Sequence, residues 1–380
     1  MLLLPKKESH HGATAALIVI LCSHWLVNSF QGGARFRYGH SIKSRTKSVD
    51  STTRPADGET SEPSQLQVMG VVAPLKYKGP YPCLSLCFPN LDSCPTWDFV
   101  VDTGANMNTI RQNLVKDYNL SYIKGLQQPT TTAGVGGSFT PGNMVLIGDA
   151  ALAGLPAEQS NVTFIRNLTA AALPRASPTA GILGSSFCSM FAGGVEFDWY
   201  GTNGDPPTFC FYFDNSAANT KGMTRIPIEE IFGLYTVTIS INGMETMALL
   251  DTGSPITIVS TMAAAKAGIF AMGQDEGNER TTPNITMDHR LLIGGIDGRP
   301  MEIVRSSSAN ISVGVGNCHL GQGPVHIGLI PALSVLESVA GTSRGTPSAI
   351  LGLDFLRRAY RMIIQPRSLN LFLEELDDTE

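Results

Sequence analysis

The chain has 380 residues, of which 43% are hydrophobic, so it can bury a sizeable core and is neither disordered nor of low complexity. Its formal net charge is −5, and because residues 1–54 are basic, the remainder is more acidic than this total. An acidic body lacks the basic patch that binds nucleic acid or anionic membranes, so we expect neither as its partner.

Residues 1–29 have the pattern of a secretory signal peptide. Lys6 and Lys7 precede an apolar run over residues 13–27, and small residues precede Phe30. The run is short for a membrane span and contains polar residues. A retained signal anchor is the alternative, and it is the one way in which we expect the chain to contact a membrane.

Residues 30–66 differ in composition from the body of the chain. Residues 30–54 are basic and rich in Ser and Thr, which is typical of transit peptides, and residues 55–66 are polar. A signal peptide, a Phe at the cleavage point and a transit-like stretch together resemble the bipartite leaders of algae with secondary plastids. We expect entry into the secretory pathway and favour the plastid. A propeptide or disordered linker of a secreted or endomembrane protein is the alternative.

The first half of the body predicts strands separated by turns and short helices. In chain order we expect strands at 84–88 and 97–102, a helix at 112–118, a glycine-rich hairpin between 130 and 144, a helical turn at 186–191, and strands at 195–199 and 209–213 that close the unit.

The second half repeats this order. We expect a hairpin of residues 234–241 and 244–250 around Asn242 and Gly243, a helix from Thr261 to Gly268, a helix at 354–360, and a final hairpin of 361–365 and 371–373 that closes this unit as the first is closed.

Three motifs occur twice in the same order. An apolar run enters an Asp-Thr-Gly triplet at 102–104 and again at 251–253, a glycine-rich segment follows at 133–138 and at 293–298, and Ile-Leu-Gly follows at 182–184 and 350–352. Two copies in one order indicate an internal duplication. We therefore divide the body into a first lobe at 67–214, a linker at 215–225 and a second lobe at 226–380.

This order of motifs resembles the aspartic proteases, in particular the retropepsin-like branch, over about residues 70–376. The resemblance implies a mainly β, bilobal fold of two retropepsin-like barrels related by a pseudo-twofold axis, with short helices. It implies an endopeptidase that needs no cofactor or metal and cleaves an extended polypeptide between the lobes. It also implies a monomer whose lobes act as an intramolecular dimer.

The resemblance assigns roles to residues of both copies. The catalytic pair is Asp102 and Asp251. The supporting turn residues are Thr103, Gly104, Ala105, Thr252, Gly253 and Ser254, and the substrate-binding flaps contain Gly134, Val135, Gly136, Gly137, Gly294, Gly295, Ile296 and Gly298.

Two adjacent carboxylates suit peptide hydrolysis because they cannot both ionise. Like charges ~3 Å apart repel by roughly 5 kcal/mol at an effective dielectric near 20, so the pair shares one proton, as is known for aspartic-protease dyads. The ionised carboxylate then activates water while the protonated one polarises the carbonyl. Ser254, where the first copy has Ala105, leads us to expect the charge on Asp251 and the proton on Asp102.

Other interpretations stay open. Six cysteines follow the leader, and we expect disulfides or buried thiols rather than a zinc site, which would lack a fourth ligand. Residues 341–345 match the Gly-x-Ser-x-Gly pattern of serine hydrolases but lie in loop-like sequence.

The main rival to a protease is a catalytically inactive peptide-binding or inhibitor module of the same fold. Ser186, which stands where the second copy has Asp354, departs from the repeat and leaves pepsin-like specificity in doubt.

Overall fold

The computed structural model describes residues 70–123, 130–133, 139–155, 165–174, 179–201, 205–213, 218–269, 290–294, 300–314, 317–328 and 347–375. The expected signal peptide, the transit-like segment and residues 341–345 lie outside the described residues. The short helices are α2 (Gln112–Asp117), α3 (Ser185–Cys188), α4 (Thr261–Lys266) and α6 (Leu353–Leu356).

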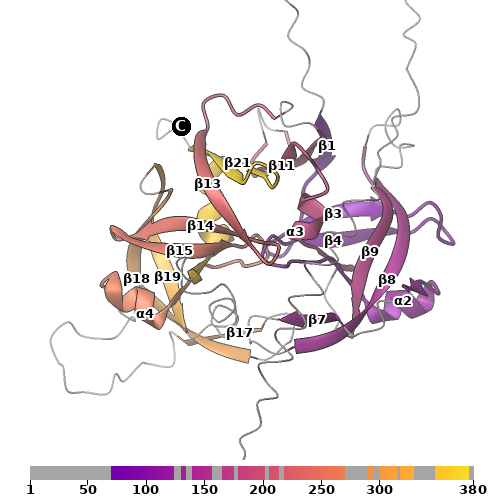
Figure 1. The fold of residues 1–380 in the computed structure, drawn as a ribbon, viewed down its shortest axis with the longest axis horizontal. Helices are drawn as coiled ribbons and strands as arrows, with labels where there is room; N and C mark the ends of the chain where they lie inside the picture. The colour runs from indigo at the N-terminus through magenta and orange to yellow at the C-terminus, as the bar shows by residue number, and fades with distance from the viewer. Residues whose placement is uncertain are drawn as a thin grey trace, which may run out of the picture.

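The strands account for most of the described chain (Figure 1). They are β1 (Gly70–Pro74), β2 (Lys76–Lys78), β3 (Tyr81–Cys87), β4 (Thr96–Val101), β5 (Thr109–Arg111), β6 (Ser121–Tyr122), β7 (Thr130–Ala133), β8 (Phe139–Leu152), β9 (Ile165–Leu173), β10 (Gly181–Leu183), β11 (Gly194–Asp198), β12 (Thr208–Tyr212), β13 (Thr224–Ile231), β14 (Leu234–Ile241), β15 (Met244–Leu250), β16 (Ile258–Ser260), β17 (Arg290–Gly294), β18 (Pro300–Val313), β19 (Cys318–Gly328), β20 (Pro347–Leu351), β21 (Ala359–Gln365) and β22 (Asn370–Glu375).

The two lobes share one strand topology. The first lobe has the order β3-β4-β10-β5-β9-β8 and the second has β14-β15-β20-β16-β19-β18, and each closes on itself through a β3–β8 or β14–β18 pairing. In each lobe the strand that enters the Asp-Thr-Gly triplet pairs in parallel with the Ile-Leu-Gly strand. The expected mainly β, bilobal fold and the internal duplication are confirmed.

The strands that we expected to close each lobe instead join the two lobes. β11 pairs with β12 on one side and with β21 of the second lobe on the other, which gives a sheet in the order β1-β12-β11-β21-β22-β13. Every residue of β11 is buried, so this strand needs a neighbour on both edges and cover on both faces. The expectation was wrong because a period-two pattern identifies a strand but not its partner.

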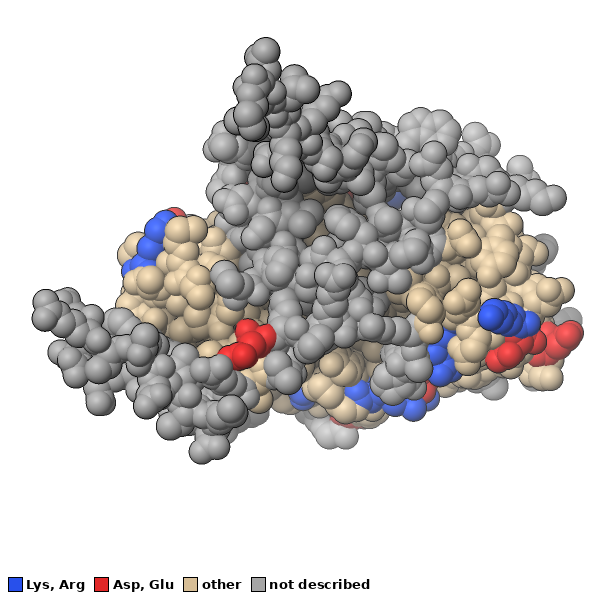
Figure 2. Space-filling model, turned by 90° about the horizontal axis from the view of Figure 1, so that it is seen from below, with Lys and Arg blue, Asp and Glu red and all other residues tan. Residues whose placement is uncertain are grey.

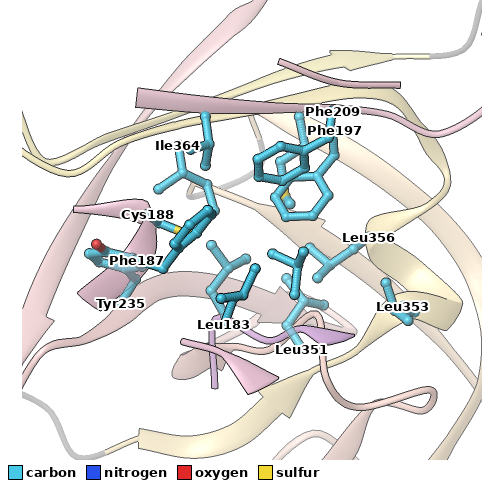
Figure 3. Close-up of a cluster of buried hydrophobic side chains, with 14 of the residues drawn as sticks. Leu183, Phe187, Cys188, Phe197, Phe209, Tyr235, Leu351, Leu353, Leu356 and Ile364 are labelled. Carbon is cyan, nitrogen blue, oxygen red and sulfur yellow. The ribbon is translucent and has the colours of Figure 1, made fainter. Parts of the chain in front are cut away.

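Apolar side chains from both lobes pack beneath this shared sheet. Figure 3 shows Leu183 and Phe187 of the first lobe close to Leu351 and Leu356 of the second, with Phe197 on the sheet above them. All five side chains are fully buried. The Ile-Leu-Gly strands that support the two Asp-Thr-Gly turns therefore meet in one continuous core, which fixes the turns relative to each other.

A buried charged cluster also crosses the lobe boundary. Glu196 of β11 is 4% exposed, accepts a 2.6 Å hydrogen bond from Tyr212 Oη and lies 3.3 Å from Nη1 of Arg361 on β21. Arg361 also donates through Nε to Glu374 of β22. Because removing one partner of a buried pair leaves an uncompensated charge, this cluster makes the joint between the lobes sensitive to substitution.

We expect Arg361→Met to lower the free energy of unfolding by about 3 kcal/mol, measured by urea denaturation, because Glu196 stays buried without its cation. The double variant Glu196→Gln with Arg361→Met removes both charges and keeps a partner for Tyr212, so it is expected to regain most of the loss. Equal destabilisation in both variants would mean that lost packing, and not the unpaired charge, dominates.

The local predictions were confirmed with three adjustments. The Asn242–Gly243 hairpin forms between β14 and β15, and α2 lies within residues 112–118. Helix α4 is capped by Ser260, whose hydroxyl accepts from the Ala263 N–H, rather than by Thr261. Helix α6 ends at Leu356, since residues 359–360 already belong to β21. β13 begins at Thr224, so the end of the expected linker is a strand.

The cysteines of the described residues are free thiols, and four of them, Cys83, Cys188, Cys210 and Cys318, are buried. The buried-thiol alternative therefore fits these four, and the structure forms no disulfide between any of the six described cysteines. Within the described ranges, no helix combines the length and apolar character required to cross a membrane.

Candidate active site

Each Asp-Thr-Gly triplet forms a tight turn at the end of a buried strand. The Asp102 N–H donates to the Leu183 carbonyl at 2.9 Å, and the Gly104 N–H donates to Asp102 Oδ1 at 2.9 Å. In the second lobe the corresponding bonds join Asp251 to Leu351 at 3.1 Å and Gly253 to Asp251 Oδ1 at 2.8 Å. The expectation that turn N–H groups point at the carboxylates is therefore met in both lobes.

The two turns are tied together by their threonines, both completely buried. Thr103 Oγ1 donates to the Leu250 carbonyl at 2.7 Å and accepts from the Thr252 N–H at 3.0 Å. Thr252 Oγ1 donates to the Val101 carbonyl at 2.8 Å and accepts from the Thr103 N–H at 3.1 Å. The two hydroxyls thus make four bonds across the lobe boundary and hold the turns in register.

The carboxyl groups of Asp102 and Asp251 lie between the turns, close enough for each to shift the pKa of the other. Each also lies against the glycine of the opposite turn. A Cβ added at Gly104 would lie 2.3 Å from Asp251 Cγ, and one added at Gly253 would lie 2.2 Å from Asp102 Cγ. Glycine is therefore required at both positions for the carboxylates to meet.

Burial and proximity keep this pair from ionising twice. Burial raises the pKa of Asp102, and hydrogen bonds from Asp251 and from backbone N–H groups oppose that rise. Burial raises the pKa of Asp251 further, because the neighbouring Asp102 charge acts in the same direction. The two carboxyl groups therefore titrate together and share one proton and one negative charge.

The expected assignment of the charge to Asp251 rested on the Ser254 hydroxyl, and the structure does not bear out that premise. Ser254 Oγ donates to the Ile256 carbonyl at 2.7 Å instead of to Asp251. Its backbone N–H is at 3.4 Å from the Asp251 carbonyl, and the Ala105 N–H is at 3.2 Å from the Asp102 carbonyl, so the two residues support their turns alike. The hydroxyl forms a local turn, and it cannot at the same time stabilise a carboxylate charge.

A second layer of polar residues, which the sequence motifs did not indicate, holds the turns from behind. Asn108 Oδ1 accepts from the Gly184 N–H at 3.0 Å, and Thr257 Oγ1 accepts from the Gly352 N–H at 3.0 Å. Thr257 in turn donates to Asp354 Oδ1 at 2.6 Å. Asn108 and Thr257 each follow their aspartate by the same interval, so aligning the two copies residue by residue is the signal that reveals them.

Of the expected flap residues, the structure describes Gly294, which ends β17. β7 pairs with β8 and β17 pairs with β18, in each case antiparallel, and Gly294 is opposite Pro300. Figure 1 shows β7 and β17 on the side of the molecule away from β11 and β21. The remaining expected flap residues lie outside the described ones: Gly134, Val135, Gly136, Gly137, Gly295, Ile296 and Gly298.

The described part of the chain contains no group of side chains suited to hold a metal ion. Among the described residues, no three His, Cys, Asp or Glu side chains lie close enough to hold a metal ion. In Figure 2 the described Lys, Arg, Asp and Glu side chains that are visible lie at the two sides and along the lower edge of this face, and both signs of charge occur there. The dyad of Asp102 and Asp251 is the site to which both lobes contribute alike.

Comparison with known proteins agrees with this geometry. Residues 90–187, which contain the first Asp-Thr-Gly turn and its Ile-Leu-Gly strand, match the family model described as aspartyl protease. The chain has an aspartic protease-like fold. A search of curated proteins found no significant match to the chain.

Several solved structures have similar folds. Soybean basic 7S globulin has 11% sequence identity and a TM-score of 0.45, with 81% of this chain and 94% of that chain covered. The aspartic proteinase from Irpex lacteus has 14% identity and a TM-score of 0.46, with 82% and 98% covered. Conglutin gamma from lupine seeds has 9% identity and a TM-score of 0.45, with 81% and 95% covered. Because these scores are below 0.5, we base the aspartic protease-like fold on the duplicated strand topology and the family match.

Proposed function

We propose that the chain is an aspartic endopeptidase that hydrolyses peptide bonds with a water molecule activated by Asp102 and Asp251. The observation that carries this proposal is the close approach of two carboxyl groups, one from each lobe, each of which lies against the glycine of the opposite turn. Such a pair supplies a base and an acid at one point, which is what peptide hydrolysis requires.

In this proposal Asp102 is the ionised carboxylate and Asp251 is the protonated one. Ionised Asp102 takes a proton from a bound water, which attacks the carbonyl carbon, and Asp251 donates a hydrogen bond to the carbonyl oxygen as negative charge develops there. The Gly104 and Gly253 N–H groups, at 2.9 and 2.8 Å from their carboxylates, hold both side chains in place before the substrate arrives. The tetrahedral intermediate then collapses as a proton passes to the departing amine.

An extended polypeptide is the substrate class that suits this arrangement. Hairpins β7–β8 and β17–β18 present antiparallel strands from both lobes, and a peptide in β conformation offers matching backbone donors and acceptors. The lobes belong to one chain and share a sheet, so a monomer is sufficient for activity in this proposal.

The full chain should cleave members of a peptide library, and Asp251→Asn should lose this activity by about 10³-fold or more, because Asn cannot hold the transferable proton. Cleavage positions read by mass spectrometry would give the sequence preference in the same experiment. The nearly isosteric Asn keeps the turn, so circular dichroism of the variant serves as the control for folding.

A catalytically inactive peptide-binding module is the second candidate, since the same site would still accept an extended chain. That alternative predicts that wild type and Asp251→Asn both bind library peptides and that neither cleaves them at any pH. Cleavage by wild type alone establishes the enzyme, whereas equal cleavage by both proteins would contradict the proposed dyad.

A further inference from the structure

A buried histidine lies behind the Asp251 turn and has no role in the proposed chemistry. His326 of β19 is 6% exposed, and its Nδ1 has no hydrogen-bond partner. Its backbone N–H donates to the Thr257 carbonyl at 3.0 Å, so the residue is attached directly to the segment that follows the turn. An unpaired polar atom in the interior is costly, and its presence calls for an explanation.

The first lobe has a different residue at the position that corresponds to His326. β5 pairs with β9 as β16 pairs with β19, and in these registers Thr109 is opposite Ala171 while Ile258 is opposite His326. The Ala171 N–H donates to the Asn108 carbonyl at 2.9 Å, just as the His326 N–H donates to Thr257. His326 therefore occupies the position of a buried alanine, and the fold itself does not require a histidine there.

The polar side chains behind the two turns also differ, because an ionisable group is present only in the second lobe. In the first lobe the Asn108 amide accepts from Gly184 and donates to the Thr169 carbonyl at 3.2 Å, so the support is neutral. In the second lobe Thr257 is bonded to the carboxyl group of Asp354, and the position of Asp354 corresponds to the exposed Ser186. Only the second turn is supported by groups that titrate.

This support is packed tightly against the turn. A Cβ on Gly352 would lie 2.4 Å from the Ile256 carbonyl oxygen and 2.9 Å from that of Ser254, and the Leu353 N–H donates to Ser254 at 2.9 Å. A displacement of Thr257 or Gly352 is therefore transmitted to the backbone next to Asp251, because no space remains to absorb it.

The charged groups around His326 come from two elements. Asp354 of α6 attracts a proton to the imidazole, and Arg305, opposite His326 on β18, repels it. The positive charge of Arg358 lowers the pKa of Asp354, and its guanidinium donates hydrogen bonds to the Leu320 and Gln322 carbonyls of β19. Helix α4 also packs against β19, and its one charged residue is the exposed Lys266. Burial outweighs the attraction of Asp354 and lowers the pKa of His326 below its ordinary 6.5.

We propose that His326 is a positioning residue for the Asp251 turn, and that its protonation loosens this turn and not the Asp102 turn. The buried imidazole fits the site only while it is neutral. When it takes up a proton, a cation faces Arg305 and competes with Thr257 for Asp354, so the bond that holds Gly352 weakens. The second half of the active site thereby becomes sensitive to acid.

The sign of the effect follows from linkage. A group whose pKa is lower in the folded than in the unfolded protein contributes stability above its unfolded pKa, and this contribution is lost as the pH falls through the folded pKa. The full-length wild type should therefore lose thermal stability relative to His326→Ala as the pH falls below 6.5. His319→Ala, which replaces an exposed histidine on the same strand, should follow the wild type.

Two measurements on the full chain test the proposal. In NMR spectra with labelled histidine, the His326 signal, identified by its absence in His326→Ala, should titrate below 6.5. If His326→Ala does not fold, His326→Gln keeps a neutral side chain of similar length and takes its place. Parallel stability curves, or a His326 signal that titrates at or above 6.5, would overturn the proposal.

The positioning role rests on the proposed function and has its own readout. The kcat of wild type should fall by up to about tenfold per pH unit relative to His326→Gln below the pKa of His326, with KM changed less. Equal pH profiles would reject the positioning role. A protein that shows no cleavage in any form would refute the proposed function and leave the titration result standing.

Discussion

Thr252→Val is expected to lower the free energy of unfolding by about 2–6 kcal/mol and to reduce turnover. Valine has nearly the same shape as threonine but leaves the Val101 carbonyl and the Thr103 N–H without the partners that they have at 2.8 and 3.1 Å. Each unpaired buried group costs about 1–3 kcal/mol. Because domains are stable by only about 5–15 kcal/mol, the loss is a large part of the total.

The control for this prediction is Thr252→Ser, which keeps the hydroxyl and removes only a methyl group. Urea denaturation of the full chain should show serine close to wild type and valine far below it. The same order should hold for kcat, since loosening the turns separates Asp102 from Asp251. If valine and serine variants were equally stable, the cross-lobe hydrogen bonds would not be what holds the turns together.

Thr103→Val should resemble Thr252→Val because each hydroxyl makes the same pair of bonds in the opposite direction. The symmetry of this contact explains why the Asp-Thr-Gly triplets could be recognised from sequence alone. Each turn must fit against the other turn, so both copies need the same apolar strand, threonine and glycine. A single Asp-Thr-Gly triplet would have been much weaker evidence for an active-site turn.

The sequence was least informative where contacts depend on strands that are distant along the chain. The alternation in β11 predicted a strand, but its pairing with β21 depends on how two separately closed barrels meet. The same applies to Glu196 and Arg361, which look like unrelated surface charges until the shared sheet places them together. Long-range partners are chosen by packing, and local pattern does not encode them.

Side-chain direction was the other feature that the sequence did not reveal. Ser254 was expected to donate to Asp251 because it directly follows the second Asp-Thr-Gly triplet, yet its hydroxyl turns to the Ile256 carbonyl. Small hydroxyl side chains often bond to nearby backbone, and this local alternative outcompeted the carboxylate. The sharing of one proton therefore follows from burial and from the closeness of the two carboxyl groups, and not from the Ser254 hydroxyl.

The roles of the glycines were predicted only in part. The sequence indicates that Gly104 and Gly253 permit a tight turn, but it does not show that each glycine is needed for the aspartate of the other lobe. The distances make this clear, since the missing Cβ of Gly253 would overlap the Asp102 carboxyl group. In each Asp-Thr-Gly triplet, the glycine therefore makes room for the aspartate of the other triplet.

Gly253→Ala is expected to abolish most of the turnover, by about 10²-fold or more, because the new methyl group forces Asp102 out of position. Its Cβ would lie 2.2 Å from Asp102 Cγ and 2.4 and 2.5 Å from the two carboxylate oxygens, well inside any contact distance. The carboxylate can move away only by giving up Asp251 or the Gly104 N–H. The kcat and the urea midpoint of the full chain would both be measured.

Gly243→Ala separates this collision from general backbone strain. Gly243 has a φ of +83° in the hairpin between β14 and β15, and nothing lies within 4 Å of an added Cβ. Alanine there should cost about 1 kcal/mol in stability and leave kcat unchanged. Gly253→Ala has no such strain in its backbone, so a loss of turnover beyond that of Gly243→Ala must come from the displaced carboxylate. Similar kcat values for the two variants would mean that Asp102 has room to move and still act, and that the close contact of the two lobes is not required for the chemistry.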